Sequence, residues 1–464
     1  MERVSGMGQD TIAAVATGTT NAGISIIRIS GTEAFRIAEE LFVPKTGKKK
    51  LSEMASHTMH YGTIRQEDAI VDEVLLSVMK APNTYTKENI VEINCHGGIL
   101  VTKKVLRLVL SHGARLAEPG EFTKRAFLNG RIDLSQAEAV IDLIHAANEQ
   151  AMQNSVRQLG GSLYRKISGL REDILRDTAW IEAALDDPEH ISLDGFEETL
   201  REHTEQSITQ LEELLSHAAD GKIIKEGIRT VILGKPNAGK STLLNALVGE
   251  ERAIVTEIPG TTRDTLEELI QLKGVALRIV DTAGIRTTSD TVEKIGVEKA
   301  RKEAETADLL LYVADATRPL DENDEAVIEI LKGRKAVVLL NKSDLPALVT
   351  AQELKEKTEK QVLEISAKQE QGIEQLSEII EHMFYQGLID RKEEVFITSL
   401  RHEQALKEAK ESLLQVLLSL DNHMPEDFYS IDLMNAYQML GEIIGEAVDE
   451  DLVNMIFKEF CMGK

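Results

Sequence analysis

The sequence predicts a multidomain protein in which an α/β domain is inserted into an α-helical domain that follows an α+β domain. A glycine-rich loop joins a predicted strand to a predicted helix at residues 234–241. Strands and helices then alternate over residues 228–385, and long helical periodicities lie on both sides, at 126–219 and 400–460. The 464 residues exceed what a single hydrophobic core accommodates, so several domains are expected.

The N-terminal segment predicts strands separated by turns. Three β-branched or alternating runs have strand character, at residues 24–29, 74–79 and 90–95. Residues 99–110 follow with apolar side chains at helical spacing. Arg28 interrupts the first run and Glu92 lies in the third. A charged residue within a strand usually occupies its outward face, and this is the interpretation from pattern alone.

Helical periodicity dominates the next part of the chain. It covers residues 126–185 and 196–219, with a turn at Asp186-Asp187-Pro188, and it returns at 400–420 and 431–460. Residues 221–227 are interpreted as the lead into the strand before the glycine-rich loop. The predicted domains are 1–121 (α+β), 122–225 (helical, first part), 226–386 (inserted α/β) and 387–464 (helical, second part).

Composition excludes several classes of protein. Hydrophobic residues make up 42% and charged residues 28%, the balance of a globular protein, and no apolar run approaches 18 residues. With no signal-peptide pattern either, we expect a cytoplasmic protein without a membrane span. The net charge of −25 argues against nucleic-acid binding over the whole surface. The one dense basic run, 45–50, is interpreted as a solvated loop, and two distant cysteines predict no disulfide framework.

The glycine-rich loop has the pattern G-x-x-x-x-G-K-S, from Gly234 to Ser241. It follows the apolar run 230–233 and precedes the helix-forming run 242–247. In that context its backbone N–H groups and the helix N-terminus form a cradle for phosphate oxygens. Lys240 would bring a positive charge to the outer phosphates, and the Ser241 hydroxyl is a hard oxygen ligand for magnesium.

Further motifs lie at the ends of later predicted strands. The strands are expected around Val231 and at 277–280, 309–314, 336–340 and 362–365, in a mostly parallel sheet that binds ligands at the strands' carboxyl ends. The motifs are G-T-T-R-D at 260–264, D-T-A-G at 281–284, N-K-S-D at 341–344 and S-A-K at 366–368.

With the loop, these motifs resemble the five motifs of the Ras-like GTPases in order and spacing. Thr262 resembles the switch threonine that completes magnesium binding, Asp281 would hold the ion through water, and Gly284 would contact the outermost phosphate. The Asp344 carboxylate can accept both the ring N–H and the exocyclic amine of guanine. Because adenine lacks that amine, the sequence predicts GTP rather than ATP as the nucleotide.

One position departs from the Ras pattern. Ile285 stands where Ras-type enzymes have the glutamine that positions the attacking water, and an isoleucine side chain cannot do this. A nearby carboxylate is the simplest replacement. Asp290, Glu293 and Glu298 are all available in the following polar segment, and the pattern leaves the choice among them open.

Several features together resemble the MnmE (TrmE) family of tRNA-modification GTPases over nearly the whole chain. They are the arrangement of domains, the C-terminal F-C-M-G-K at 460–464, P-G-E-F-T at 119–123, R-A-F-L-N at 125–129 and Q-A-E-A at 136–139. The family usually has isoleucine where this chain has Met462, a change that nearly conserves volume.

The resemblance implies a homodimer, formed through N-terminal domains that bind a tetrahydrofolate one-carbon derivative. It further implies an FAD-containing MnmG (GidA)-type partner, in a heterotetramer or larger complex, with FAD only in that partner. Together they would add an aminomethyl or carboxymethylaminomethyl group to carbon 5 of the wobble uridine of certain tRNAs. The implied folate contacts are Arg28, Glu92, Arg131 and Lys464, which replaces the outward-face interpretation of the first two.

The resemblance also implies the remaining site residues. Potassium would bind through Asn237, Thr256, Ile258 and Thr261, magnesium through Ser241 and Thr262, and the catalytic residues would be Glu293 and Cys461. The implied GTP contacts are Asn237, Ala238, Gly239, Lys240, Ser241, Thr242, Thr256, Glu257, Ile258, Pro259, Gly260, Thr261, Thr262, Asp281, Thr282, Ala283, Gly284, Asn341, Lys342, Asp344, Ser366, Ala367 and Lys368.

Two alternatives belong to other classes of protein. A ribosome-associated GTPase that acts as an assembly or timing factor would perform no one-carbon chemistry. Such factors commonly carry a basic RNA-binding module, and none is visible in this sequence. A structural scaffold with a degenerate nucleotide domain is disfavoured because all five motifs are intact.

Overall fold

The computed structural model forms two compact units, each built from separate segments of the chain. The first unit comprises Met1–Ile141, Gln158–Asp194 and Ser419–Lys464, and the second comprises Asp142–Arg157 and Gly195–Leu418. The division into four domains expected from the sequence stays a prediction. The structure describes residues 10–47, 50–187, 190, 195–250, 268–272, 274–280, 301–385, 395–446, 448, 450–458, 460 and 463.

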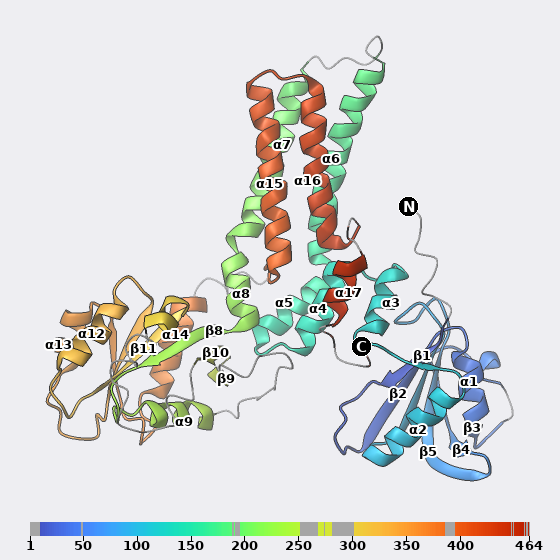
Figure 1. Cartoon of the computed structure of the whole chain (residues 1–464), viewed down its shortest axis with the longest axis horizontal. Helices are drawn as coiled ribbons and strands as arrows, with labels where there is room; N and C mark the ends of the chain where they lie inside the picture. The colour runs from blue at the N-terminus through green and yellow to red at the C-terminus, as the bar shows by residue number, and fades with distance from the viewer. Residues whose placement is uncertain are drawn as a thin grey trace. The chain divides into compact units, whose positions relative to one another are not determined.

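A seven-stranded, mostly antiparallel sheet forms the N-terminal part of the first unit, in the order β3-β4-β5-β6-β2-β1-β7 (Figure 1). Helices α1 and α2 cover one of its faces, where they share a core with the buried alternate residues of the strands. The element bounds are β1 Ile12–Val15, β2 Ile24–Ser30, α1 Ala34–Leu41, β3 Phe42–Pro44, β4 Thr58–Gln66, β5 Ala69–Met79, β6 Ile90–His96, α2 Ile99–Ser111 and β7 Arg115–Leu116, with a 3-10 turn at Leu51–Glu53. The predicted strands at 24–29, 74–79 and 90–95 and the helix at 99–110 are confirmed.

The opposite face of this sheet is covered unevenly. Over β1, Phe122 packs on Ile12 and Ala14. Over β4 and β5, the alternation of side chains leaves apolar residues in solvent, with Met59 59%, Tyr61 49% and Leu75 41% exposed. The strand pairing places Arg28 directly opposite Glu92, so that the two charged side chains share a face.

Helices make up the rest of the first unit. In the second unit, further helices precede and follow the α/β part in the sequence. Within the first unit α6 packs along α16, and Arg171 lies 4.0 Å over the Tyr437 ring while its Nη1 contacts Glu446 at 2.5 Å. The bounds are α3 Glu121–Leu128, α4 Leu134–Ile144, α5 Glu149–Leu159, α6 Ser162–Asp186, α7 Phe196–Ser216, α8 Ala218–Glu226, α15 Leu400–Asp421, α16 Glu426–Ile444 and α17 Glu450–Lys458.

Two expectations for the helical segments were wrong in detail. Residues 221–227 are not an open lead into the strand, because helix α8 continues to Glu226. Gly221 serves close packing there, since an added Cβ would collide with the backbone of Ile397. The periodicity at 431–460 is two helices, because α16 ends at Gly445, whose φ of 87° cannot continue a right-handed helix.

The second unit contains a six-stranded sheet in the order β13-β12-β11-β8-β10-β9. Five strands are parallel, and β9, which the sequence reasoning missed, pairs antiparallel with β10 at the edge. Helices α9 and α14 pack on one face, and α12 and α13 on the other. The bounds are β8 Ile228–Leu233, α9 Lys240–Glu250, β9 Glu268–Leu272, β10 Val275–Ile279, β11 Leu309–Asp315, α12 Glu322–Leu331, β12 Ala336–Asn341, α13 Ala351–Thr358, β13 Gln361–Ile365 and α14 Ile373–Tyr385. No helix among the described residues has both the length and the apolar composition needed to cross a membrane.

Candidate functional site

The glycine-rich loop lies between β8 and α9, at the carboxyl edge of the parallel strands. Positive φ angles at Gly234 (145°), Asn237 (62°) and Gly239 (102°) fold its backbone back on itself. The Lys240 ammonium lies inside the loop, where it donates to the carbonyl oxygens of Gly234 at 2.5 Å and Lys235 at 2.7 Å. Burial lowers the pKa of Lys240. A cation held at a helix N-terminus beside a curved backbone fits the phosphate groups of a nucleotide.

Asn341, the last residue of β12, joins the predicted base-recognition motif to this loop. Its side chain is 3% exposed. The amide nitrogen donates to the Ala238 carbonyl at 2.8 Å, and the amide oxygen accepts from the Ala367 N–H at 3.0 Å. Gly239 completes the contact, because an added Cβ would overlap the Asn341 amide. Three of the predicted motifs are therefore brought together at one edge of the sheet.

Asp344 and Lys342 lie around this junction. The Asp344 side chain is exposed, and one of its carboxylate oxygens accepts a hydrogen bond of 2.7 Å from the buried Ser366 hydroxyl. This bond fixes the orientation of the carboxylate, a group whose two oxygens can accept from a base with two adjacent donors. The Lys342 ammonium lies 2.5 Å from Asp315, a residue that the sequence reasoning missed. Burial alone would raise the pKa of Asp315, but its bonds with Lys342 and Thr317 lower it overall.

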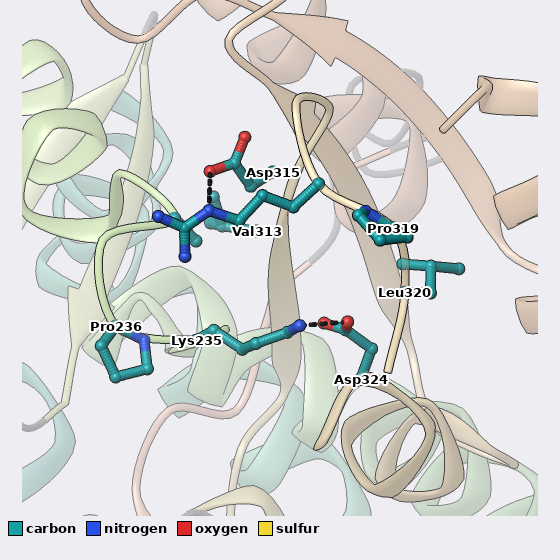
Figure 2. Close-up of a pocket in the computed structure, with 9 residues that line it drawn as sticks. Lys235, Pro236, Val313, Asp315, Pro319, Leu320 and Asp324 are labelled. Carbon is teal, nitrogen blue, oxygen red and sulfur yellow. Dashed lines mark ion pairs between the residues drawn. The ribbon is translucent and has the colours of Figure 1, made fainter. Parts of the chain in front are cut away.

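A second group of missed residues supports the outer side of the loop. Lys235 forms ion pairs at the N-terminus of α12, with Asp321 at 2.8 Å and with Asp324 at 2.6 Å. Figure 2 shows the pair with Asp324. Asp324 also accepts a hydrogen bond from the buried Tyr312 hydroxyl at 2.7 Å. Burial and this bond raise the pKa of Tyr312. A small pocket lies between Lys235, Pro236 and Asp315 and the start of α12. The only sequence signal was the D-x-x-D capping box at 321–324.

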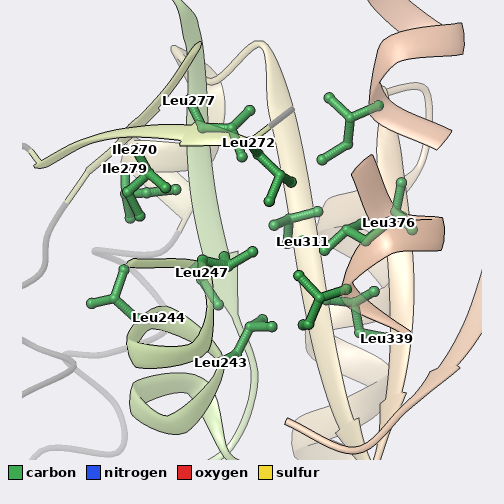
Figure 3. Packing of buried hydrophobic residues seen from close by; sticks show 14 of the residues in the cluster. Leu243, Leu244, Leu247, Ile270, Leu272, Leu277, Ile279, Leu311, Leu339 and Leu376 are labelled. Carbon is green, nitrogen blue, oxygen red and sulfur yellow. The ribbon is translucent and has the colours of Figure 1, made fainter. Parts of the chain in front are cut away.

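The helix that follows the loop is anchored in the core of the sheet. Leu243, Leu244 and Leu247 of α9 are all at most 1% exposed, and they face Ile270 of β9 and Leu277 of β10 (Figure 3). Close packing of this kind fixes the start of α9 and with it the position of Lys240 and Ser241. The predicted contact Thr242 lies on the exposed side of α9, and Lys368 is likewise exposed.

Many predicted site residues lie outside the described part of the chain. They include the proposed catalytic residues, most of the potassium and switch residues and one folate contact: Thr256, Glu257, Ile258, Pro259, Gly260, Thr261, Thr262, Asp281, Thr282, Ala283, Gly284, Glu293, Cys461 and Lys464. The alternative carboxylates Asp290 and Glu298 also lie outside it.

A second polar site lies on the sheet of the first unit. The Arg28 Nε lies 2.8 Å from the Glu92 carboxylate, and Arg28 Nη1 donates to the carbonyl oxygen of Gly463 at 3.3 Å. The guanidinium of Arg131 lies 4.6 Å from the centre of the Tyr85 ring, and the guanidinium of Arg28 lies 5.9 Å from the same centre. Two predicted folate contacts, Arg28 and Arg131, therefore lie at the ring of Tyr85, which pattern reasoning missed, and a third, Glu92, pairs with Arg28.

A mostly buried charge cluster surrounds Arg125 of α3. Arg125, with a side chain only 7% exposed, contacts Asp10 at 2.7 Å, Glu121 at 3.0 Å and Glu88 at 3.1 Å. Burial alone would raise the pKa of Glu121, but hydrogen bonds from Arg115, the Glu118 N–H and Arg125 lower it overall. The pKa of Asp10 is lowered in the same way by its two arginine partners. The cluster fixes α3 against the residues that precede β1.

The phosphate loop, joined through Asn341 to a motif suited to guanine, defines a P-loop GTP-binding protein. Family models described as "GTP-binding protein TrmE N-terminus" and "MnmE helical domain" match residues 11–131 and 134–461. The chain belongs to the MnmE (TrmE) family of tRNA modification GTPases. This membership confirms the predicted enzyme class, a GTPase of tRNA modification.

Relatives named "tRNA modification GTPase MnmE" match over almost their full length. The one from Lachnoclostridium phytofermentans is 60% identical over 99% of this chain and 100% of its own length. The one from Clostridioides difficile is 49% identical over 98% of this chain and 99% of its own. Among solved structures, the G domain of the T. maritima FeoB iron transporter is 29% identical over 34% of this chain and 98% of its own, with a TM-score of 0.26.

Proposed function

We propose that this protein hydrolyses GTP in the course of modifying the wobble uridine of certain tRNAs. With an FAD-containing MnmG (GidA)-type partner it would add an aminomethyl or carboxymethylaminomethyl group to carbon 5. The observation that carries the proposal is the Asn341 bridge between the phosphate loop and the guanine motif. It occurs in a chain whose relatives are named for tRNA modification, which favours this function over a ribosome-associated timing factor.

Residues of the phosphate loop and residues of the base motif would bind different parts of GTP. The loop backbone and Lys240 would hold the phosphates, and the exposed Asp344 carboxylate would accept from guanine. Magnesium would be held by Ser241, in the first turn of α9, and by Thr262. That ion would neutralise charge on the outer phosphates, and hydroxyl oxygens are ligands that it prefers. The fixed start of α9 in the core supports this role for Ser241.

Potassium would bind beside the phosphates through Asn237, Thr256, Ile258 and Thr261. Asn237 lies on the exposed part of the loop with φ of 62°, which suits a residue whose side chain faces a ligand. A monovalent cation there would stabilise charge that builds up during hydrolysis. Glu293 would orient the attacking water, because Ile285 cannot.

The tetrahydrofolate derivative would bind at Arg28, Glu92, Arg131 and Lys464. The set of donors and acceptors fits that cofactor, because a carboxylate can accept from adjacent pterin nitrogens and cations can pair with the carboxylates of the folate tail. The Tyr85 ring, which both arginines approach, would add an aromatic surface for the cofactor. Cys461 would act close by, since Gly463 lies within hydrogen-bond distance of Arg28.

Association of two copies through the N-terminal sheet is part of the proposal, as is a cytoplasmic location beside tRNA. The exposed apolar residues Met59, Tyr61 and Leu75 lie on the same sheet face as Arg28 and Glu92. A second copy that covered this face would bury apolar area and place the two folate sites near the dimer interface.

GTP turnover tests the catalytic part of the proposal. We expect potassium to accelerate hydrolysis and sodium to have little effect. Glu293→Ala should bind GTP like the native chain and hydrolyse it roughly 10²-fold more slowly, the scale of a lost acid–base or water-positioning group. Asp290→Ala is the matched control and should retain native turnover. Equal rates in both cations, or native turnover in Glu293→Ala, would contradict the proposed roles.

A further inference from the structure

Residues 235–237 form the outer side of the phosphate loop, and packing is incomplete on one side of them. The small pocket of Figure 2 opens beside this segment and is also lined by Val313. The neighbouring parts of the loop are held more closely. An added Cβ at Gly234 would collide with the Val313 carbonyl oxygen, and Ala238 is bonded to the Asn341 amide. The outer segment therefore has room to shift, and packing alone does not fix its position.

The Lys235 side chain holds this segment from outside the loop. Its ammonium lies 2.6 Å from the Asp324 carboxylate and 2.8 Å from the Asp321 carboxylate. Among the described residues, no other group of residues 235–237 forms a hydrogen bond or an ion pair outside residues 234–241. These two ion pairs are therefore the polar contacts that set the position of the outer segment.

Asp324 is itself fixed in place on both carboxylate oxygens. Its Oδ1 accepts from the buried Tyr312 hydroxyl at 2.7 Å, and its Oδ2 accepts from the Asp321 N–H at 2.9 Å as well as from Lys235. The Asp324 side chain is only 4% exposed. A buried carboxylate bonded on both oxygens cannot turn toward solvent, so it determines where the Lys235 ammonium lies.

The backbone of Lys235 connects this network to the nucleotide site. Its carbonyl oxygen accepts from the Lys240 ammonium at 2.7 Å, and the preceding carbonyl, of Gly234, accepts from the same ammonium at 2.5 Å. A shift of the outer segment would move the first of these carbonyls. The orientation of the Lys240 ammonium would change with it.

We propose that Lys235 is a positioning residue for GTP, whose ion pair with Asp324 fixes the carbonyl that orients the Lys240 ammonium toward the outer phosphates. This role rests on the phosphate-binding part of the proposed function, in which Lys240 holds the phosphates. A phosphate-loop lysine reaches the β- and γ-phosphates, and GDP lacks the second of these. The correct orientation of Lys240 therefore contributes more to the binding of GTP than to the binding of GDP.

The ratio of GTP affinity to GDP affinity tests this role. Titrations of the full chain with fluorescent GDP and with a fluorescent, non-hydrolysable GTP analogue measure both affinities. Lys235→Met removes the charge and keeps a long side chain, and it should weaken GTP binding about tenfold and GDP binding less than about threefold. Lys235→Arg can still pair with both carboxylates and should keep the native ratio. Lys332→Met removes an exposed ion pair at the end of α12 and is the matched control, with a native ratio expected.

A double variant separates this role from folding. Lys235→Met leaves the buried Asp324 carboxylate without its cation, which can destabilise the domain. Lys235→Met combined with Asp324→Asn removes both charges, so its thermal midpoint should lie closer to the native value than that of Lys235→Met. It should still show the reduced ratio of GTP to GDP affinity. A native ratio in this double variant, or equal losses of GTP and GDP affinity, would overturn the positioning role.

Lys240→Ala distinguishes failure of this role from failure of the proposed phosphate binding. Because Lys235 would act through the Lys240 ammonium, Lys235→Met should not change the affinity ratio further when Lys240→Ala is already present. A further change in the combined variant would overturn the positioning role alone. Native GTP affinity in Lys240→Ala would instead contradict the phosphate contact that the proposed function assigns to Lys240.

Discussion

The side-chain amide of Asn341 donates a 2.8 Å hydrogen bond to the carbonyl oxygen of Ala238, across 103 positions of sequence. The same side chain accepts from the N–H of Ala367. One buried residue thus fixes the phosphate loop and the base-binding loops relative to each other, and the two ends of a nucleotide would be recognised by a single rigid unit.

Removing this bridge should weaken GTP binding. Asn341→Ala leaves the Ala238 carbonyl and the Ala367 N–H without their buried partner, at a cost of about 1–3 kcal/mol each when unsatisfied. We expect the dissociation constant for GTP to rise about 10-fold to 100-fold. Titration with a fluorescent GTP analogue measures it. The exposed Asn323→Ala, in the same sheet domain, should bind like the native chain, and equal affinities for both variants would show that the bridge has no role.

A second prediction concerns the choice of nucleotide. Asp344→Asn should lose GTP affinity and gain affinity for xanthosine triphosphate, because an amide donor suits the extra carbonyl of xanthine. The Ser366 hydroxyl can still bond the amide oxygen, so the side chain should keep its orientation. Competition titrations with GTP, xanthosine triphosphate and ATP measure the change. Equal binding of ATP and GTP by the native chain would contradict guanine recognition by Asp344.

The folate site should require both ends of the chain. Deletion of residues 461–464 removes the Gly463 carbonyl that accepts from Arg28 and removes Lys464 as well. We expect tetrahydrofolate binding to fall at least about tenfold while GTP binding stays native. Calorimetric titration with both ligands checks this. Native folate affinity after the deletion would show that the tail contributes nothing to the site.

Acid should destabilise the first unit through the Arg125 cluster. The pKa values of Glu121 and Asp10 are lower in the folded chain than their ordinary values, so the folded state binds fewer protons. Their contribution to stability is present above the ordinary carboxyl pKa of about 4 and is lost as pH falls through the lower folded values. Urea unfolding from pH 7 to pH 3 should show this loss.

Two substitutions of glutamate by glutamine, one inside the cluster and one outside it, test this pH dependence. Glu121→Gln removes one titrating group, so its free energy of unfolding should fall less steeply below pH 5 than that of the native chain. Glu40→Gln changes an exposed carboxylate on α1 and should leave the native slope. Parallel slopes for all three proteins would show that the cluster does not govern acid unfolding.

Local patterns in the sequence predicted the helices and strands better than they predicted which side chains contact one another. The run 24–29 and the helix 99–110 were found because side-chain periodicity reports burial directly. Strand β9 was missed, since its five residues, E-L-I-Q-L, are few and do not alternate between polar and apolar side chains. Helix α8 was missed because Gly221 suggests a turn. The structure explains this glycine by the close approach of the Ile397 backbone, which leaves no room for a Cβ at position 221.

Contacts between distant segments could not be found from pattern alone. The Lys235 ion pairs and the Lys342–Asp315 pair depend on how β11 and the loop after it lie beside the phosphate loop. Tyr85 joins Arg28 to Arg131 across 103 positions, and no local spacing predicts such a contact. The family resemblance supplied Arg28 and Glu92, for which the pattern alone favoured only an outward strand face.

The central claim is that this GTPase acts in modification of the wobble uridine. Its most direct test is nucleoside analysis of tRNA from cells that lack the protein, with the native chain or Lys240→Ala returned to them. The account predicts that aminomethyl-type derivatives of the wobble uridine disappear, that the native chain restores them, and that Lys240→Ala does not, because the buried ammonium in the phosphate loop is lost. Unchanged tRNA nucleosides in cells without the protein would contradict it.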